Sequence, residues 1–598
     1  PQAVAAAPPR RWEWAVLAGI VGLAILARYS GLTQGFPRDY HWDERLYFHE
    51  SFYTLANGLA HDSTLSANLP YLLDLVVLTV GLPGFLGGSI HNLGDLIHRY
   101  LADPQPFVLA GRSVWAAAGV ASVLVVYRIG RRLAGPVVGL SAAFFLAIAY
   151  IHVAEGHFIK NDGPAGLWLL LALDRCLSIQ ARGTRRDYLW AGLWIGLAAA
   201  TKYYCVALAP AILLAHLLRP ATAAAPRRVR DLLYAAFSAG AAILVTTPML
   251  ALDPLGFVRL LIRDAALGHP ALDTGGSPQW LFYLTEHLSS GLGWPLLALG
   301  VLGLVPALRL GPPGWLLTVF TVGFYGALNL VPANFARYIV PLVPLLCLSA
   351  ALALWQGGQI GARLLGARAV PRWSGLVVLP AVVLLVSSPS WLALLRYSRL
   401  AAAPDTRNAA QVWFERAVPA GATVLIEGGT AFEQFSNLGP QLWPLPDQIA
   451  ALGAAPPSET LFRQQLLAVD QAHPVTYRLT LIGAVDRRNV GPPGNWHPEP
   501  LTSMADQGWP DYALLLNWRS AALRPGSDSP LWRSLTDHYT LVQTFACAPC
   551  FPDDPYNWNI DPATLARIAP FGGPPVVAGP AIRVFQRTDT AFRLRAMP

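Results

Sequence analysis

The chain has 598 residues, of which 54% are hydrophobic and only 13% are charged, and its mean hydropathy is +0.41. About a quarter of the residues of a typical soluble protein are charged, so this composition argues against a wholly soluble chain. The formal charge is +8, but the arginines lie between apolar runs and no basic-aromatic motif accompanies them, so we expect no nucleic-acid partner.

Apolar runs fill most of residues 1–394 and predict a multi-pass membrane domain. Eleven runs are candidate spans, namely 12–29, 108–127, 136–150, 164–179, 188–201, 203–218, 232–251, 293–309, 315–331, 338–355 and 374–393. With this count, the arginine clusters all fall on one side of the membrane, and these clusters are 10–11, 128–132, 182–186, 227–230 and 363–372. The positive-inside rule makes that side the cytoplasm and also places the N-terminus there.

A further apolar run at 69–90 is long enough to span but would put the later arginine clusters outside. We therefore predict that it lies in the outer interface, as an amphipathic segment around Asp74. The external side then carries two long loops, 30–107 and 252–292. We expect the protein in the plasma (inner) membrane, surrounded by membrane lipids.

Residues 395–598 have the composition of a globular domain. A helix-like stretch at 405–418 precedes strand-like runs at 423–427, 476–482, 511–517, 539–545 and 580–586. This order predicts a soluble α/β domain, which the topology places outside the cytoplasm. There the C-A-P-C pair of Cys547 and Cys550 favours a local disulfide over a redox motif or a zinc site.

Two acidic clusters lie at the predicted outer membrane face. Asp43 and Glu44 adjoin in R-D-Y-H-W-D-E-R, and Asp162 ends H-V-A-E-G-H-F-I-K-N-D-G-P. Ionisable groups at a bilayer boundary are costly and suggest function, so we expect these clusters to share one cavity. The alternative is that they are solvated interface residues or helix caps, and Asp162, just before Pro164, fits a cap well.

Lysine is almost absent, since 41 of the 43 basic residues are arginines and only Lys160 and Lys202 are lysines. Both lysines fall at outer ends of spans, as does Arg337 in N-F-A-R-Y-I-V-P. A phosphate can be held by an ammonium or a guanidinium, so these three are candidate phosphate ligands. Chance within an arginine-rich composition explains the lysines equally simply, and snorkelling explains Arg337.

Further polar and aromatic residues near these positions are candidate substrate ligands, namely His157, Tyr203, His269 and Tyr338. Asp273 and Glu286 accompany His269 in the second external loop. Asp43, Asp162 and His157 would be the ligands of a divalent metal, but no spacing requires one, and no other cofactor is indicated.

Taken in order, these motifs resemble the GT-C superfamily of polyprenyl-phosphate-sugar-dependent glycosyltransferases. The likeness is to the branch of the protein O-mannosyltransferases and the lipid A aminoarabinose transferase. It rests on the Asp43–Glu44 pair, H-F-I-K-N-D-G-P, G-L-A-A-A-T-K-Y-Y and R-Y-I-V-P-L-V-P, together with G-G-S-P-Q-W-L-F-Y-L in the second loop and D-T-R-N-A-A-Q-V-W-F in the tail. It covers roughly residues 10–430.

The resemblance implies a GT-C membrane fold and transfer of a hexose or pentose from a polyprenyl-phosphate donor, with inversion. The acceptor would be a protein, glycan or lipid at the outer face. In this scheme Asp43 is the general base, Glu44 orients it or the acceptor, and Asp162 shares the proton, binds sugar hydroxyls or holds a metal. Lys202, Arg337 and Lys160 stabilise the leaving phosphate.

Two other classes of function remain open at this point. A transporter would carry polar residues near the middle of its spans, whereas the charges here concentrate at the outer ends. A non-catalytic scaffold subunit of a membrane complex has no sequence feature that excludes it.

Overall fold

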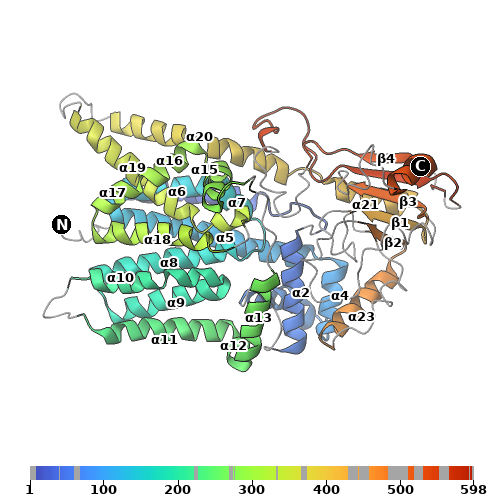
Figure 1. Cartoon of the computed structure of the whole chain (residues 1–598), viewed down its shortest axis with the longest axis horizontal. Helices are drawn as coiled ribbons and strands as arrows, with labels where there is room; N and C mark the ends of the chain where they lie inside the picture. The colour runs from blue at the N-terminus through green and yellow to red at the C-terminus, as the bar shows by residue number, and fades with distance from the viewer. Residues whose placement is uncertain are drawn as a thin grey trace.

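The protein is described here by a computed structural model that covers residues 9–38, 41–58, 68–220, 227–267, 274, 276–331, 334–364, 374–427, 442, 457–482, 509–516, 530–550, 565–590 and 593–594. A bundle of long helices forms one part of the molecule, and a five-stranded sheet with its own helices forms the other (Figure 1). Shorter helices lie between these two parts.

The predicted apolar runs all fold as helices or as consecutive helix pairs. The bundle contains α1 (Arg11–Tyr29), α5 (Gln105–Ala134), α6 (Pro136–Ile148), α8 (Asp162–Ala181), α9 (Arg185–Thr201), η1 (Tyr203–Leu208) followed by α10 (Pro210–Leu218), α11 (Val229–Thr246) followed by α12 (Pro248–Leu252), α16 (Trp294–Leu302) followed by α17 (Leu304–Arg309), α18 (Pro312–Leu328), α19 (Val343–Leu364) and α20 (Ser374–Ala401).

By length and composition, six helices of the described chain can cross a membrane, or seven if a bent pair counts as one span. The six are α1, α3 (Leu69–Leu86), α5, α11, α19 and α20, and the bent pair joins residues 279–292 to residues 294–309 at 117°. A multi-pass membrane fold is thus confirmed, whereas the count of eleven spans stays a prediction.

Helix α3 is long and apolar enough to cross a membrane, and its two ends contact different elements. Asn68, just before it, donates a hydrogen bond to Thr201 at the end of α9. Near its other end, Gly81 lies against Leu96 of α4 (Leu93–Ala102), a helix that packs against the sheet part of the molecule. One end of α3 thus contacts the bundle and the other contacts α4, and the interfacial placement of this segment stays a prediction.

Several other short helices gather at this end of the bundle, which we call the site end. They are α2 (Trp42–Asn57), α7 (Tyr150–Glu155), α13 (Pro254–Leu267), α14 (Gln279–Phe282), η2 (Tyr283–Leu288), α15 (Ser289–Leu292) and η3 (Ala336–Ile339). Figure 1 shows α2, α4 and α13 running across the direction of the bundle helices.

Glycines allow the tight reversals and the close packing of the bundle. Gly135 has a φ of 91°, which permits a reversal before Pro136 opens α6. Within the resulting α5–α6 pair, a Cβ on Gly130 would lie 2.9 Å from the Cα of Gly139, so the two backbones touch directly.

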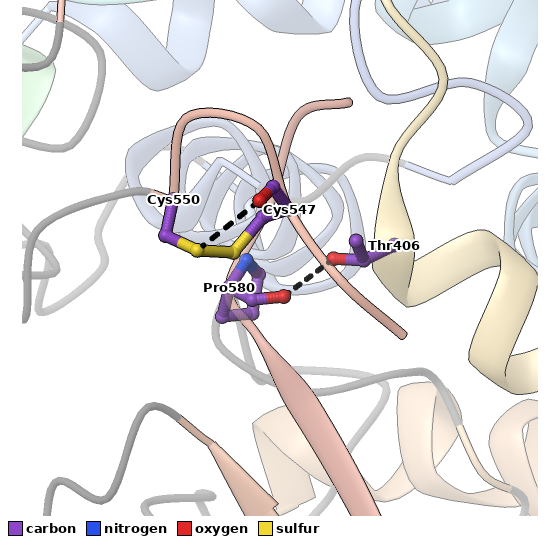
Figure 2. Close-up of a disulfide and its surroundings, with 4 residues drawn as sticks. All are labelled: Thr406, Cys547, Cys550 and Pro580. Atoms are coloured by element: carbon purple, nitrogen blue, oxygen red, sulfur yellow. Dashed lines mark hydrogen bonds between the residues drawn. A yellow bond between two sulfur atoms is a disulfide. The ribbon is translucent and has the colours of Figure 1, made fainter. Parts of the chain in front are cut away.

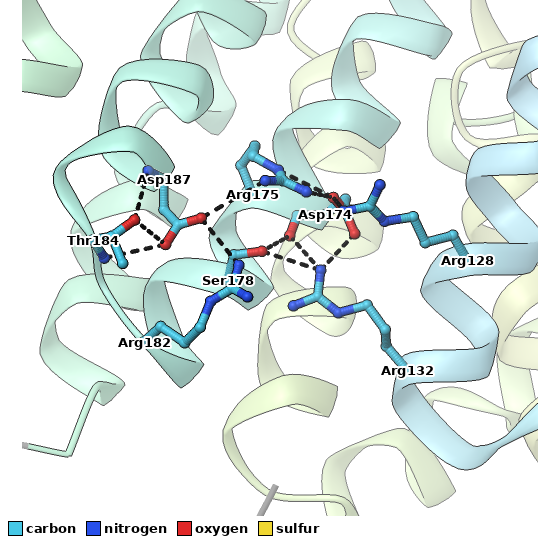
Figure 3. A network of polar contacts seen from close by, with 8 residues as sticks. All are labelled: Arg128, Arg132, Asp174, Arg175, Ser178, Arg182, Thr184 and Asp187. Atoms are coloured by element: carbon cyan, nitrogen blue, oxygen red, sulfur yellow. Dashed lines mark hydrogen bonds and ion pairs between the residues drawn. The ribbon is translucent and has the colours of Figure 1, made fainter. Parts of the chain in front are cut away.

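The described residues of the predicted arginine clusters gather at the opposite end of the bundle, which we call the arginine-rich end, and Arg368 and Arg372 lie outside the described residues. The end of α19 and the start of α20 lie there, at the left of Figure 1. Figure 3 shows Arg128 and Arg132 of α5 reaching the buried Asp174 of α8, at 3.1 and 2.5 Å. Asp187 of α9 is approached by Arg182 at 3.5 Å, so ion pairs join the helices at this end.

The C-terminal part, residues 405–594, is called the sheet domain below. Its strands are β1 (Thr423–Glu427), β2 (Arg478–Ile482), β3 (Tyr512–Leu516), β4 (Tyr539–Phe545) and β5 (Ile582–Arg587), in the order β2-β1-β3-β5-β4. The first three are parallel, and β5 is antiparallel to both β3 and β4. All five predicted strands are confirmed.

Helices cover the sheet on both faces, which is why every residue of β3 is buried. Phe414 of α21 (Thr406–Ala417) shares one core with Leu514, and Leu535 of α25 (Pro530–His538) shares another with Leu515. The sequence predicted α21, but α25 and α23 (Pro457–Ala472) were not predicted. The α/β class is therefore confirmed for the described part of this domain.

Cys547 and Cys550 form the predicted disulfide (Figure 2). Ala548, between them, forms an isolated bridge to Val577, and the adjacent Pro580 carbonyl accepts a hydrogen bond from Thr406 at 2.7 Å. The disulfide thus lies where the chain passes alongside the start of α21.

We predict that the two ends of the bundle lie on opposite sides of the membrane. Exposed residues at the two ends should therefore differ in their accessibility to a reagent added outside the cell. In Ala420→Cys, a membrane-impermeant maleimide should label intact cells, whereas Arg186→Cys at the arginine-rich end should react only after permeabilisation. The native thiols give little background, because Cys176, Cys205 and Cys347 are buried. Labelling of Ala420→Cys only after permeabilisation would overturn the orientation.

Candidate active site

Helix α2 brings Asp43 to a residue far along the chain. Asp43 lies in the first turn of α2, and its Oδ2 accepts a hydrogen bond from Nη1 of Arg337 at 2.6 Å across 294 positions of sequence. Arg337 lies in η3, just before α19. Their side chains are 14% and 19% exposed, so this ion pair is partly accessible.

A second ion pair joins Asp162 to Lys202. Asp162 begins α8 and Lys202 caps the end of α9, so the reversal between these helices returns both residues to the site end. Lys202 Nζ donates to Asp162 Oδ1, and both side chains are buried. The other carboxylate oxygen, Oδ2, is buried and has no hydrogen-bond partner among the residues that the structure describes.

The two ion pairs form one cluster through η3. The ring of Tyr338, next to Arg337 in sequence, lies 4.0 Å from Lys202 Nζ. Burial lowers the pKa of Arg337, but Asp43, Tyr338 and Asp162 raise it, and the pKa ends above its ordinary value. The charge of Arg337 therefore interacts with the carboxylates of both Asp43 and Asp162. The predicted convergence of Asp43, Asp162, Lys202 and Arg337 in one place is observed.

Lys160 belongs to a neighbouring buried pair that the sequence analysis did not identify. Its Nζ lies 2.6 Å from Oε2 of Glu155, and the two side chains are 4% and 2% exposed. Burial raises the pKa of Glu155 and the Lys160 ammonium opposes this, but the pKa remains raised overall. Glu155 stands five residues before Lys160 in the motif already singled out, and that spacing was the available signal.

Glu44 is held by the buried Arg112 of α5. Nε and Nη2 of Arg112 donate to the two Glu44 oxygens at 2.9 and 2.7 Å, and the Ile159 amide donates to Oε1 at 3.0 Å. Nη1 of Arg112 donates to the carbonyls of Leu32 and Gln34. Both oxygens of Glu44 are engaged and the side chain is fully buried, so the geometry suits a role in orienting α2.

Sequence reasoning did not single out Arg112. The available signal was a lone cation in the first turns of an otherwise apolar run, a position that usually has a buried partner.

The predicted substrate ligands have different surroundings. His157 is buried, with ring nitrogens 3.0 Å from the Tyr397 hydroxyl and 3.0 Å from the Ala27 carbonyl, which indicates a structural residue rather than a substrate ligand. Tyr203 packs against Phe257 of α13, with ring centroids 6.2 Å apart. His269 and Asp273 lie outside the described residues, and Glu286 is exposed.

The cluster does not fit a metal ion. Among the residues that the structure describes, no group of three or more His, Cys, Asp or Glu side chains is arranged to hold one. Asp43 and Asp162 each face a cation instead of another ligand, and His157 is engaged elsewhere. We derive no step through a metal.

Residues 108–250 match the family described as dolichyl-phosphate-mannose-protein mannosyltransferase. This match confirms the resemblance found in the sequence, over the segment from α5 to α12 that carries Lys160, Asp162 and Lys202. No curated protein matches the chain in sequence.

Solved structures of two proteins are among those similar to this chain. One is the oligosaccharyltransferase AglB of Archaeoglobus fulgidus in complex with an inhibitory peptide and a dolichol-phosphate, at 15% identity and a TM-score of 0.42 over 68% of this chain and 58% of that chain. The other is ArnT of Cupriavidus metallidurans bound to undecaprenyl phosphate, at 14% identity and a TM-score of 0.47 over 90% and 96%. This chain thus spans less than two thirds of the length of AglB.

The environment of Glu44 predicts a stability defect in Glu44→Gln. The change leaves the buried Arg112 without its counter-charge, so the free energy of unfolding should fall by about 3–5 kcal/mol. Thermal unfolding of the purified protein measures this loss, with Asp43→Asn as the control at a more accessible ion pair. A stable Glu44→Gln protein without activity would instead give Glu44 a direct part in the chemistry.

Proposed function

We propose that this protein is an inverting membrane glycosyltransferase that moves a hexose or pentose from a polyprenyl-phosphate donor to an acceptor hydroxyl at the outer membrane face. The acceptor would be a protein, a glycan or a lipid. The observation that carries the proposal is the single cluster formed by the Asp43–Arg337 and Asp162–Lys202 pairs, which unites a partly accessible carboxylate with two buried or half-buried cations.

The arrangement of the bundle supports a site at the outer face. The arginine-rich end lies on the cytoplasmic side under the positive-inside rule, so the site end and the sheet domain lie outside. We infer eleven spans, residues 1–394 as the membrane domain and 395–598 as the external domain. A site at this boundary leaves the donor's polyprenyl tail in the bilayer while the acceptor arrives from water.

The two cations supply the environment that the leaving phosphate requires. When the bond between the anomeric carbon and the phosphate oxygen breaks, negative charge develops on the phosphate, and fixed cations in a poorly hydrated site stabilise that charge strongly. Lys202 is held in place by Asp162 and the Tyr338 ring. Arg337 can add a second contact.

Asp43 is the proposed base. The side chain of Asp43 is more exposed than that of Asp162. As the acceptor oxygen bonds to the anomeric carbon, the acceptor hydroxyl transfers its proton to the Asp43 carboxylate. Inversion puts the base and the leaving phosphate on opposite faces of the sugar. The Asp43–Arg337 contact must therefore open, and we infer that the donor phosphate draws Arg337 away and leaves the carboxylate available.

Asp162 has a supporting part in this scheme. One of its oxygens holds Lys202, and the buried Oδ2 without a partner can accept a hydrogen bond from a sugar hydroxyl. An acceptor atom left unpaired inside a protein costs stability, and a bound ligand removes that cost.

Asp43→Asn should abolish transfer while leaving donor binding in place. Loss of a general base lowers rates by about 10²- to 10⁴-fold, and asparagine keeps the size of the side chain. Transfer of radiolabelled sugar from polyprenyl phosphate measures the rate, with the exposed Glu286→Gln as the control. Full activity in Asp43→Asn would remove the catalytic assignment.

Lys202→Met should weaken donor binding. A charge-assisted hydrogen bond contributes about 1.5–3 kcal/mol, so affinity for polyprenyl phosphate should fall roughly 10- to 100-fold. Because this change also leaves Asp162 uncompensated, the double variant Lys202→Met with Asp162→Asn separates folding from binding. The double variant should recover stability but not affinity, and unchanged donor affinity in both would contradict the phosphate role.

A further inference from the structure

Helix α2, which carries Asp43, is contacted by the sheet domain as well as by the bundle. Phe462 of α23 packs on two residues one turn apart on α2, with its ring centroid 4.8 Å from that of His49 and 6.4 Å from that of Phe52. Phe462 and Phe52 are both buried. Helix α23 lies between β1 and β2 in sequence, so the contact belongs to the sheet domain itself.

A second contact ties the sheet domain to the segment that leads into α2. The side-chain amide of Asn408 in α21 donates to the carbonyls of Gly35 and Phe36, at 3.2 and 2.8 Å. These carbonyls lie just before α2, beside the Leu32 and Gln34 carbonyls that Arg112 holds. The entry to α2 is thus fixed from both parts of the molecule.

Further hydrogen bonds hold α2 at both of its ends. Ser51 and Thr54 donate to Asp74 of α3 at 2.6 and 2.8 Å, and Glu44 is held by Arg112. A helix rises 1.5 Å per residue, so Phe52 lies about 14 Å along the axis from Asp43. A displacement of the Phe462 contact is therefore transmitted along α2 to its first turn.

We propose that Phe462 is a positioning residue that sets the placement of Asp43 through α2, so that the sheet domain takes part in the sugar-transfer step. This inference rests on the proposed function. Phe462 touches neither Asp43 nor Arg337 in any contact that the structure describes, and its effect is on geometry alone. A misplacement of about 1 Å at a reacting group can cost about 100-fold in rate.

Phe462→Ala tests the proposal in the full-length protein. The kcat for sugar transfer should fall at least about tenfold, while binding of polyprenyl phosphate changes less than about twofold, because Lys202 and Arg337 lie on other elements. Phe462→Leu, which refills much of the space, should restore most of kcat. The matched control is Phe571→Ala, an aromatic of the same domain that is 72% exposed, and its kcat should match that of the unmodified protein.

A measurement that does not depend on the chemistry separates this inference from the proposed function. Spin labels on Asn57→Cys at the end of α2 and Arg186→Cys at the arginine-rich end report the position of α2 relative to the bundle. Phe462→Ala should broaden or shift the distance between the labels, and Phe571→Ala should leave it unchanged.

The distance between the labels and the kcat together decide whether Phe462 has the positioning role. An unchanged distance with an unchanged kcat overturns the positioning role, as does an equal loss of kcat and donor binding accompanied by unfolding. A shifted distance in a protein whose Asp43→Asn variant transfers sugar at full rate keeps the mechanical link but removes the proposed function.

Discussion

The charged side chains at the site end of the bundle are compensated by opposite charges inside largely buried surroundings, and this requirement organises the whole site. Removing an ion from water is expensive unless a partner and further hydrogen bonds replace the lost hydration. Glu44 with Arg112, Glu155 with Lys160, Asp162 with Lys202 and Asp43 with Arg337 each provide the oppositely charged partner, and Glu44 also accepts a further hydrogen bond from the Ile159 amide. Each pair joins separate elements, apart from the local Glu155–Lys160 pair.

The four carboxylates differ in exposure and in how many of their oxygens have a hydrogen-bond partner. Glu44 has both oxygens engaged and is fully buried, so it anchors α2. Asp162 keeps one buried oxygen without a partner among the described residues, and Asp43 is the most exposed of the three remaining carboxylates. The adjacent acidic residues of the Asp43–Glu44 pair thus have opposite surroundings, because successive residues of a helix face directions about 100° apart.

Helix α2 is the element through which the two parts of the molecule meet at the site. Its first turn is bound to the bundle through Arg112, and its middle is bound to the sheet domain through Phe462. A domain connected to the bundle only through the end of α20 could change its position relative to α2. Contacts through α21 and α23 instead join it to the segment that carries Asp43.

The sequence by itself determined the helical runs, the arginine asymmetry and all five strands, because these depend on local periodicity and on the cost of placing charge in lipid. It also located Asp43, Asp162, Lys202 and Arg337, since an ion at the end of an apolar run stands out against its neighbours. Only the tertiary structure decided the pairing. That Glu44 is held by Arg112 and that Phe462 reaches α2 depends on which elements pack together. Contacts between residues 68 or 410 positions apart leave no local pattern in the chain, because they arise from the free energy of the whole assembly of helices and sheet.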